Sequence, residues 1–377
     1  MRSVIHILGN FSILSASLFS VACGGQKQEA RPVLIEREVI DSRIDAFLKD
    51  MEREEHFTGV ALVMKKEEII HAKGYGKAKN ETENRVTTAF HVASITKQFT
   101  AAATLQLVDR GILELEESIN EYLPEEYRSS KWDNVILHDL LCHTSGITNY
   151  AVTRDYYEVV KGFCQGNTVD GMVKEAMGKE LEFDPGSKFS YSDINYTLLG
   201  IIIESQTQMP YNEYMRVNVF EPIGMKDSRI HVIGHVPEAD EAEGYRWSAE
   251  QSVHVLDDIV SLPVTEADGG LVTTLTDFAQ WVGLYMDRKQ TILNKNSISK
   301  MTSPLISVDF TGPRGNPQSY GYGLLLEDEL VHHSGYIVGF RSDFILDRQK
   351  EILIAVFSNN TTNDPIRIST GLLKIVK

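Results

Sequence analysis

The sequence predicts an α+β protein, in which an antiparallel sheet is flanked by helices and a helical lobe lies between the two halves of the sheet. Short apolar runs near residue 60 and beyond residue 320 have the length and composition of strands. The chain between them has helical periodicity and many loop signals. A helix followed by a hairpin, and then by further helices, is typical of an antiparallel sheet with helices packed on it.

Composition limits the classes of function. The chain has 377 residues, of which 42% are hydrophobic and 24% charged, so it is long enough for one large or two modest globular domains. The formal net charge of -16 argues against nucleic-acid partners and against electrostatic docking on anionic lipid. We therefore expect a small-molecule or peptide substrate.

The first 22 residues have the pattern of an export signal. Val4–Ala22 is uncharged and mostly apolar, and small residues flank Cys23. This favours a bacterial lipoprotein that is cleaved before Cys23, lipidated on its thiol and tethered to the cell envelope by residues 23–34. An ordinary secretory signal and an uncleaved anchor remain alternatives, because Ser20 stands where leucine is usual.

The following elements are predicted in chain order. An amphipathic helix occupies 35–51, because its apolar residues have helical spacing. Strands at 58–64 and 69–73 flank a polar turn at 65–67. These elements begin an α/β lobe formed by about 35–115 and 265–377, with the helical lobe at about 116–264. The catalytic domain as a whole is predicted at 35–377.

Later elements close the sheet. A short helix is predicted from Ile136 to the glycine at 146, and a longer helix begins at Tyr196. The predicted strands of the C-terminal part are 323–326, 330–333, 341–346 and 352–358, and a closing helix starts at Asp364-Pro365.

Ser94 and Lys97 carry the clearest chemical signal. They lie one helical turn apart, and the run from Phe99 to Val108 is apolar or small on nearly every face. A lysine in such a helix is costly unless it finds partners or loses its proton, and a basic amine beside a serine makes a nucleophile. The alternative is a purely structural role, in which Ser94 is a helix N-cap and Lys97 is exposed to solvent. A second Ser-x-x-Lys, Ser297 to Lys300, has polar surroundings and is predicted to be a surface copy.

Further motifs follow in a fixed order. Tyr191-Ser192-Asp193 and His333-Ser334-Gly335 follow the Ser94–Lys97 pair. In this order the motifs resemble the serine β-lactamase and penicillin-binding-protein superfamily, in particular the class C β-lactamases, D-alanyl-D-alanine carboxypeptidases and related esterases. Supporting matches are Leu140–Gly146, Phe220–Met225, Asp268–Thr274 and Tyr320–Gly323.

The resemblance implies a β-lactamase/transpeptidase-like fold and a role for each residue. Ser94 would be acylated, with Lys97 as its proton partner and Tyr191 as a second acid/base whose pKa falls beside cationic neighbours. His333, in place of a common lysine, would titrate near neutral pH and help to hold a substrate carboxylate. The remaining implied binding residues are Ser334, Gly335, which lets its strand approach the substrate, and Tyr336, whose backbone N–H would form the oxyanion hole with that of Ser94.

One position departs from the family pattern. Many relatives carry asparagine where this chain has Asp193. An ionised aspartate can only accept hydrogen bonds, so it should keep Lys97 as an ammonium and withhold a donor from a substrate carbonyl. This departure leaves room for a rival function, a weak or inactive binding protein for peptidoglycan-like peptides.

Other kinds of site have less support. His138 and His143 belong to no recognisable ligand motif, so no metal and no cofactor is predicted, and His143 is interpreted as a structural hydrogen-bonding residue at a helix end. Cys142 and Cys164, the two cysteines beyond Cys23, do not indicate a disulfide framework. The sequence thus predicts an exported serine hydrolase acting on a peptide, β-lactam or ester.

Overall fold

The structure, a computed structural model, describes residues 30–149, 168–232, 237–257, 266–286, 292–313 and 315–377. The chain forms two compact units, Met1–Val39 and Ile40–Lys377. The second unit contains the sheet and every predicted site residue except Cys23. Among the described residues, no helix combines the length and the apolar character needed to cross a membrane.

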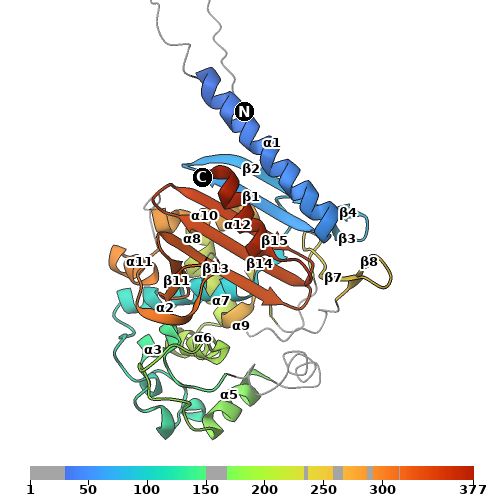
Figure 1. Cartoon of the computed structure of the whole chain (residues 1–377). Coiled ribbons are helices and arrows are strands. Elements are labelled where there is room, and N and C mark those ends of the chain that lie inside the picture. The colour runs from blue at the N-terminus through green and yellow to red at the C-terminus, as the bar shows by residue number, and fades with distance from the viewer. Residues whose placement is uncertain (1–29, 150–167, 233–236, 258–265, 287–291, 314) are drawn as a thin grey trace, which may run out of the picture. The chain divides into compact units, whose positions relative to one another are not determined.

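An eight-stranded antiparallel sheet forms the centre of the second unit (Figure 1). Its strand order is β10-β11-β12-β13-β14-β15-β1-β2, so the N-terminal hairpin joins the C-terminal strands through β1 and β15. The bounds are β1 Gly59–Lys65, β2 Glu68–Tyr75, β10 Ile306–Thr311, β11 Pro317–Tyr320, β12 Leu325–Glu327, β13 Leu330–Ile337, β14 Phe340–Asp347 and β15 Ile352–Ser358. This arrangement confirms the predicted α+β class.

Both faces of this sheet are buried, which explains its continuous apolar strands. Along β15, Leu353, Ala355 and Phe357 belong to one hydrophobic core, whereas Ile352, Ile354 and Val356 belong to another. Successive side chains of a strand point to opposite faces, so one strand supplies both cores. The N-terminal strand β1 divides its side chains in the same way.

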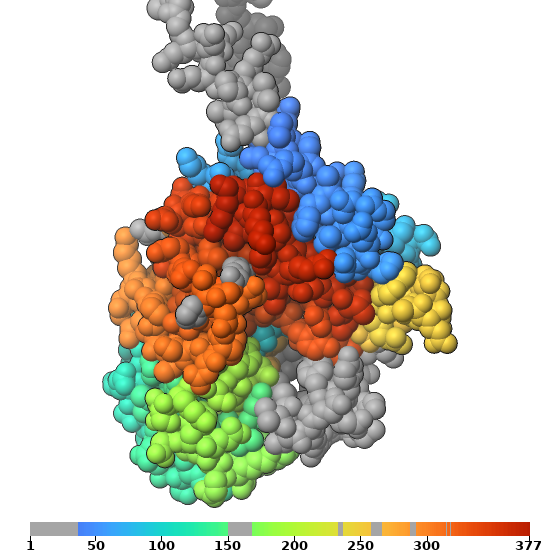
Figure 2. All heavy atoms as spheres, in the orientation of Figure 1, coloured from blue at the N-terminus to red at the C-terminus, as the bar shows by residue number. Residues whose placement is uncertain are grey.

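Two helices from opposite ends of the chain cover one face. The part of α1 (Ala30–Glu55) that lies in the second unit contributes Ile44 and Leu48, and α12 (Pro365–Val376) contributes Ile368 and Leu372. An ion pair of 2.8 Å joins Arg367 to Glu55. In Figure 2 the N-terminal part of this unit, in blue, and the C-terminal helix, in dark red, adjoin on this face. Helix α1 is longer than the predicted 35–51.

The other face packs on α10 (Leu275–Val282), whose Phe278 contacts Phe344 of β14 and Phe357 of β15. Helix α10 in turn packs on the helix that follows Ser94, where Trp281 stacks on Phe99 with ring centroids 3.8 Å apart. Helix α2 (Lys97–Asp109) is buried from Lys97 to Leu107 and ends before Gly111, whose φ of +68° is left-handed. A small sheet of order β5-β9-β6 lies at its start. The elements of this region are β5 Phe90–His91, β6 Arg229–Ile230, β9 Leu271–Thr273, α9 Glu266–Gly269, α10 Leu275–Val282 and α11 Lys295–Met301.

The region predicted to be helical contains several short helices and one hairpin. Its elements are α3 Leu137–Cys142, α5 Val169–Gly178, α6 Asp193–Thr207, α7 Tyr211–Met215, α8 Glu221–Ile223, β7 Tyr245–Ser248 and β8 Val253–Leu256. Two further short strands, β3 Lys77–Lys79 and β4 Thr82–Glu83, pair with each other. The hairpin of β7 and β8 was not predicted. Helix α3 ends earlier than the predicted glycine at 146, because His143 adopts the left-handed conformation at φ 59° and stops it.

Candidate active site

The turn that carries Ser94 is held between the two sheets. It is a short 3₁₀ helix, η1 (Ala93–Thr96), which leads directly into α2. Ala93 has a φ of +48°, a left-handed conformation that is rare for residues other than glycine. The side chain of Thr96 fixes this geometry by donating to the carbonyl of Ala93 at 2.6 Å. Ser94 thus lies on a constrained turn rather than in a regular helix.

Lys97 is completely buried and has three hydrogen-bond acceptors. Its Nζ donates to Ser94 Oγ at 3.1 Å, to Asp193 Oδ1 at 2.7 Å and to the backbone carbonyl of Asp268 at 2.8 Å. An ammonium has three donors, so these acceptors use all of them. Burial alone lowers the pKa of Lys97, but electrostatic interaction with Asp193, and then with Tyr191 and Asp268, outweighs burial and raises this pKa above its ordinary value. At rest Lys97 is therefore a cation that donates to Ser94.

Asp193 lies at the start of α6, where a carboxylate interacts favourably with the helix dipole. Its Oδ1 accepts from Lys97, and its Oδ2 accepts from Asn149 Nδ2 at 3.4 Å. The backbone N–H of Asp193 donates to Asn149 Oδ1 at 3.1 Å. Asn149 and Asp268 were not among the predicted site residues. Asp268 begins a segment, Asp268–Thr274, that was noted as a family match without a role in the site, whereas the local sequence of Asn149 gave no signal.

Tyr191 is buried beside Lys97 but differs from the prediction in its acidity. Lys97 Nζ lies 5.0 Å from the centre of its ring. Burial raises the pKa of Tyr191 to about 12, and the charge of Lys97 offsets that rise only in part because Asp193 acts in the opposite direction. The expected fall in pKa is therefore wrong. Among the described residues, its hydroxyl has no hydrogen-bond partner of good geometry.

His333 is also buried, and it is neutral at neutral pH. Its Nδ1 donates to the carbonyl of Ser334 at 2.6 Å, so its Nε2 accepts from the hydroxyl of Tyr320 at 3.4 Å. Burial, and then the charge of Lys97, lower the pKa of His333 to about 4. The predicted titration near neutral pH is wrong, and a cationic His333 cannot hold a substrate carboxylate at that pH.

Strand β13 approaches the Ser94 turn at Gly335. Beyond His332, β13 has no pairing with β12, and its free edge lies against η1. A Cβ atom on Gly335 would lie 2.1 Å from the carbonyl oxygen of Val92, so only glycine permits this approach. Ser342 lies on the neighbouring strand β14, opposite Gly335, and its hydroxyl donates to the same Val92 carbonyl at 2.8 Å. These contacts set the spacing between Ser94 and the strand edge.

A cavity of about 560 Å³ opens at this edge. Six predicted site residues line it: Ser94, Tyr191, His333, Ser334, Gly335 and Tyr336. Lys97 and Asp193 do not line it: Lys97 contacts the lining residue Ser94, and Asp193 contacts Lys97. Its wall includes Phe189 and Phe310, and the guanidinium of Arg341 stacks 4.6 Å from the ring centre of Tyr336. The structure thus brings together the predicted residues from positions 94, 191 and 333.

Two further positions singled out in the sequence are Cys23 and Ser297. Cys23, the proposed lipidation site, lies outside the described residues. Ser297, from the second Ser-x-x-Lys, is buried rather than on the surface as predicted, because its hydroxyl donates to Asp109 Oδ1 at 2.6 Å near the end of α2. His143 has the predicted structural role, since its Nδ1 accepts from the backbone N–H of Ser192 at 3.2 Å.

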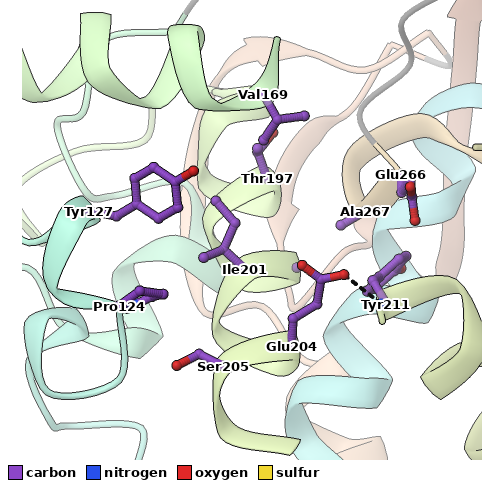
Figure 3. Close-up of a pocket in the computed structure, with 11 residues that line it drawn as sticks. Pro124, Tyr127, Val169, Thr197, Ile201, Glu204, Ser205, Tyr211, Glu266 and Ala267 are labelled. Atoms are coloured by element: carbon purple, nitrogen blue, oxygen red, sulfur yellow. Dashed lines mark hydrogen bonds between the residues drawn. The ribbon is translucent and has the colours of Figure 1, made fainter. Parts of the chain in front are cut away.

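A second cavity of about 480 Å³ is lined in part by residues of α6 and α9 (Figure 3). Glu204 and Glu266 line it, and Glu204 Oε1 accepts from the backbone N–H of Tyr211 at 2.7 Å. Burial, and then the charge of Glu204, raise the pKa of Glu266 to about 7. Its neutral form thus favours the folded state at low pH, and this contribution is lost as the pH rises from about 4.5 through 7.

His333 should affect stability in the opposite direction to Glu266: acid should destabilise the folded protein. The folded pKa of His333, about 4, is below its ordinary 6.5, so the unfolded chain binds the proton first as the pH falls. This contribution is intact above about pH 6.5 and lost as the pH falls through 4. A shift of this size corresponds to roughly 3 kcal/mol. Urea unfolding at pH 7 and at pH 4.5 gives the free energy of unfolding at each pH. Between these values we expect the free energy of unfolding to fall by about 2–3 kcal/mol less in His333→Gln than in wild type. Equal losses would show that His333 already exchanges protons freely in the folded protein.

The chain is similar to several known proteins. The family model described as Beta-lactamase matches residues 40–374. Protein flp of Staphylococcus aureus (strain MW2) is 26% identical over 326 residues, which cover 84% of this chain but only 62% of that protein. The putative penicillin-binding protein PbpX of Bacillus subtilis (strain 168) is 26% identical, covering 86% of this chain and 75% of that protein. The octameric penicillin-binding protein homologue from Pyrococcus abyssi superposes with a TM-score of 0.76 at 29% identity, covering 89% and 77% of the two chains.

Proposed function

Because the chain belongs to the Beta-lactamase family, we propose that it is a serine hydrolase that transfers an acyl group to Ser94 and then to water. The observation that carries this proposal is the contact of the buried Lys97 ammonium with Ser94 Oγ at 3.1 Å, at the edge of a cavity. Burying a cation costs free energy, and here the buried ammonium donates a hydrogen bond to the serine oxygen. The similarity to a putative penicillin-binding protein and to a penicillin-binding protein homologue supports an acyl-transfer reaction.

The protonation states favour a relay through Tyr191. Ser94 Oγ attacks the substrate carbonyl, and its proton passes to the Tyr191 oxygen as the Tyr191 proton passes to the leaving group. Tyr191 is neutral before and after this step, in accord with its raised pKa. Lys97 stays an ammonium and stabilises the negative charge that develops on Ser94 Oγ. Water then cleaves the Ser94 ester by the reverse transfer, which releases the acid and restores the hydroxyl.

A fluorescent penicillin and a p-nitrophenyl ester test this proposal together. We expect both to form an adduct on the peptide that contains Ser94, located by mass spectrometry after proteolysis, and the ester to turn over. Ester hydrolysis with no trapped adduct at Ser94, or with the adduct elsewhere, would overturn the proposal. The rival function, a binding protein without turnover, is favoured by one observation, the fully occupied ammonium of Lys97. It predicts binding of peptidoglycan-like peptides with little or no adduct on Ser94 and no turnover of the ester.

The carboxylate of Asp193 should determine which class of substrate reacts best. Asp193 raises the pKa values of both Lys97 and Tyr191. It also lacks the donor that an amide would offer to a substrate carbonyl, an omission that typically costs ~1–3 kcal/mol when buried. Small esters, which need less of that contact, should therefore react better than penicillins or peptides.

We expect Asp193→Asn to speed penicillin acylation more than ester hydrolysis, because the amide can donate and both pKa values fall. Second-order acylation rates for the two substrates, measured at one pH, give the comparison. Asp193→Ser is the matched control, since it removes the charge without restoring the amide. Slower or unchanged penicillin acylation in Asp193→Asn would contradict this role.

We also propose that the protein is exported and anchored in the envelope by a lipid on Cys23. The support is the sequence pattern around Cys23. Expressed in a bacterium, the wild-type chain should partition into detergent, and Cys23→Ser should remain in the aqueous phase or keep its signal. A wild-type product with a free N-terminus downstream of Cys23 would contradict lipidation.

A further inference from the structure

Three buried side chains converge beside the strand that precedes Ser94. His91 lies in β5, His231 directly follows β6, and Glu241 lies in the segment before β7. One ligand atom from each lies within 4.8 Å of the others. The exposed fractions are 2%, 7% and 1%, respectively. We propose that His91, His231 and Glu241 form a binding site for a divalent metal ion, most favourably Zn²⁺.

The small sheet explains how these distant residues meet. Strand β9 lies between β5 and β6, and its Val272 pairs with His91 on one side and with Arg229 on the other. The backbone N–H of His231 donates to the carbonyl of Gly270 at 2.7 Å, which extends the pairing by one residue. The two imidazole rings are 5.1 Å apart between centroids. The backbone pairing therefore holds His91 and His231 on either side of β9 before any ion binds.

The distances suit a metal centre. His91 Nε2 lies 2.9 Å from Glu241 Oε1, close to the ~3.3 Å that separates neighbouring ligand atoms around tetrahedral Zn²⁺ with bonds of ~2.0–2.1 Å. The other oxygen, Glu241 Oε2, accepts from Arg229 Nη2 at 2.7 Å, which would orient the carboxylate as a one-oxygen ligand. Within the described part of the chain, the buried Nδ1 of His91 has no hydrogen-bond partner.

The charge around the site also favours a cation. Arg229 contacts three carboxylates: Glu241 at 2.7 Å, Glu238 at 3.5 Å and Asp240 at 3.5 Å. One guanidinium cannot neutralise three carboxylates, so negative charge is left beside two imidazole rings. Two imidazoles and one carboxylate are a ligand set that Zn²⁺ accepts, with a fourth position for water. Sequence motifs could not reveal this site because its residues are distant in the chain.

The site would act on the turn that carries Ser94. His91 is separated from Ser94 by Val92 and Ala93 only, and the backbone N–H of Val92 donates to the carbonyl of Leu271 in β9 at 3.1 Å. A metal ion that joins β5 to the segments at 231 and 241 would clamp this sheet. We therefore expect the ion to stabilise the folded chain, whatever reaction Ser94 performs.

Cobalt and zinc titrations of the full chain, after dialysis against a chelator, test the site directly. We expect one equivalent of Co²⁺ to give visible d–d absorption with nitrogen and oxygen ligands, one equivalent of Zn²⁺ to displace it, and Zn²⁺ to raise Tm. His231→Gln should weaken binding by more than the ~10–100-fold typical of losing an outer hydrogen-bond partner of a ligand. His254→Gln is the matched control, because His254 lies in the β7–β8 hairpin and should leave binding unchanged.

The outcomes separate the alternatives. If His231→Gln does not fold, Glu241→Gln provides the same test, and circular dichroism identifies the folded variants. Absence of stoichiometric binding by wild type would overturn the site. Equal binding by His231→Gln and wild type, or a loss of binding in His254→Gln, would also overturn it. The proposed hydrolase reaction is not tested by these titrations, so it stands or falls separately.

Discussion

Ser94→Ala is expected to abolish covalent labelling by an acylating probe and to reduce ester hydrolysis to the rate of the uncatalysed background. The hydroxyl of Ser94 is the nucleophile of the proposed reaction, and no second serine shares its contact with Lys97 among the described residues. Removing the oxygen removes the only atom on which the ester can form. Labelling with a fluorescent penicillin, followed by gel detection and mass spectrometry, measures the effect.

Ser297→Ala is the matched control for this experiment. It changes the same residue type in the same Ser-x-x-Lys spacing, but its hydroxyl binds Asp109 rather than a lysine. We expect it to label at the wild-type rate, with a loss of stability of ~1 kcal/mol for the missing hydrogen bond. Undiminished labelling of Ser94→Ala would overturn the assignment of the nucleophile.

Replacing Lys97 by alanine should slow acylation by at least the ~10²-fold typical of a lost acid/base or charge-stabilising partner. Two effects act in the same direction. Ser94 loses the donor 3.1 Å from its oxygen, and the Asp193 carboxylate loses its cation at 2.7 Å. Asp193 would then repel the charge that develops on Ser94. Stopped-flow acylation measures the rate, and circular dichroism checks the fold.

The double variant Lys97→Ala with Asp193→Asn separates these two effects. Because it removes the unpaired carboxylate, we expect it to recover part of the lost rate and most of any lost stability. Lys300→Ala, from the second motif, should behave as wild type. Full activity of Lys97→Ala would show that Lys97 has no part in the reaction.

The sequence was sufficient for the parts of the fold that rest on local patterns. The run Ile352–Ser358 is apolar at nearly every position, and it forms a strand with both faces buried. Helix α2 could be predicted because Phe99–Val108 lacks charge and Gly111 follows it. Strands β7 and β8 were missed since each has only four residues and none of their side chains is buried.

The pKa values in the site depend on how deeply its side chains are buried, and local sequence patterns do not predict this burial. Tyr191 and His333 were correctly placed at one cavity, yet their pKa values are shifted away from the predicted direction or range. The cause is the depth at which distant strands and helices enclose them. The effect of Asp193 on Lys97 was predictable, because it follows from charge and hydrogen-bonding capacity alone. Asn149 reaches the site through tertiary contacts and gave no signal.

The order of strands in the central sheet has a consequence for how the chain acquires its structure. Strand β1 lies between β2 and β15, and the hydroxyl of Ser358 donates to the carbonyl of Thr58, 300 residues earlier. The N-terminal hairpin therefore has no neighbour on its β1 edge until almost all of the chain has been synthesised. Such nonlocal pairing slows folding and exposes an apolar strand edge in the meantime. A nascent chain that stops before β15 should thus be a substrate for chaperones and proteases rather than a shortened enzyme.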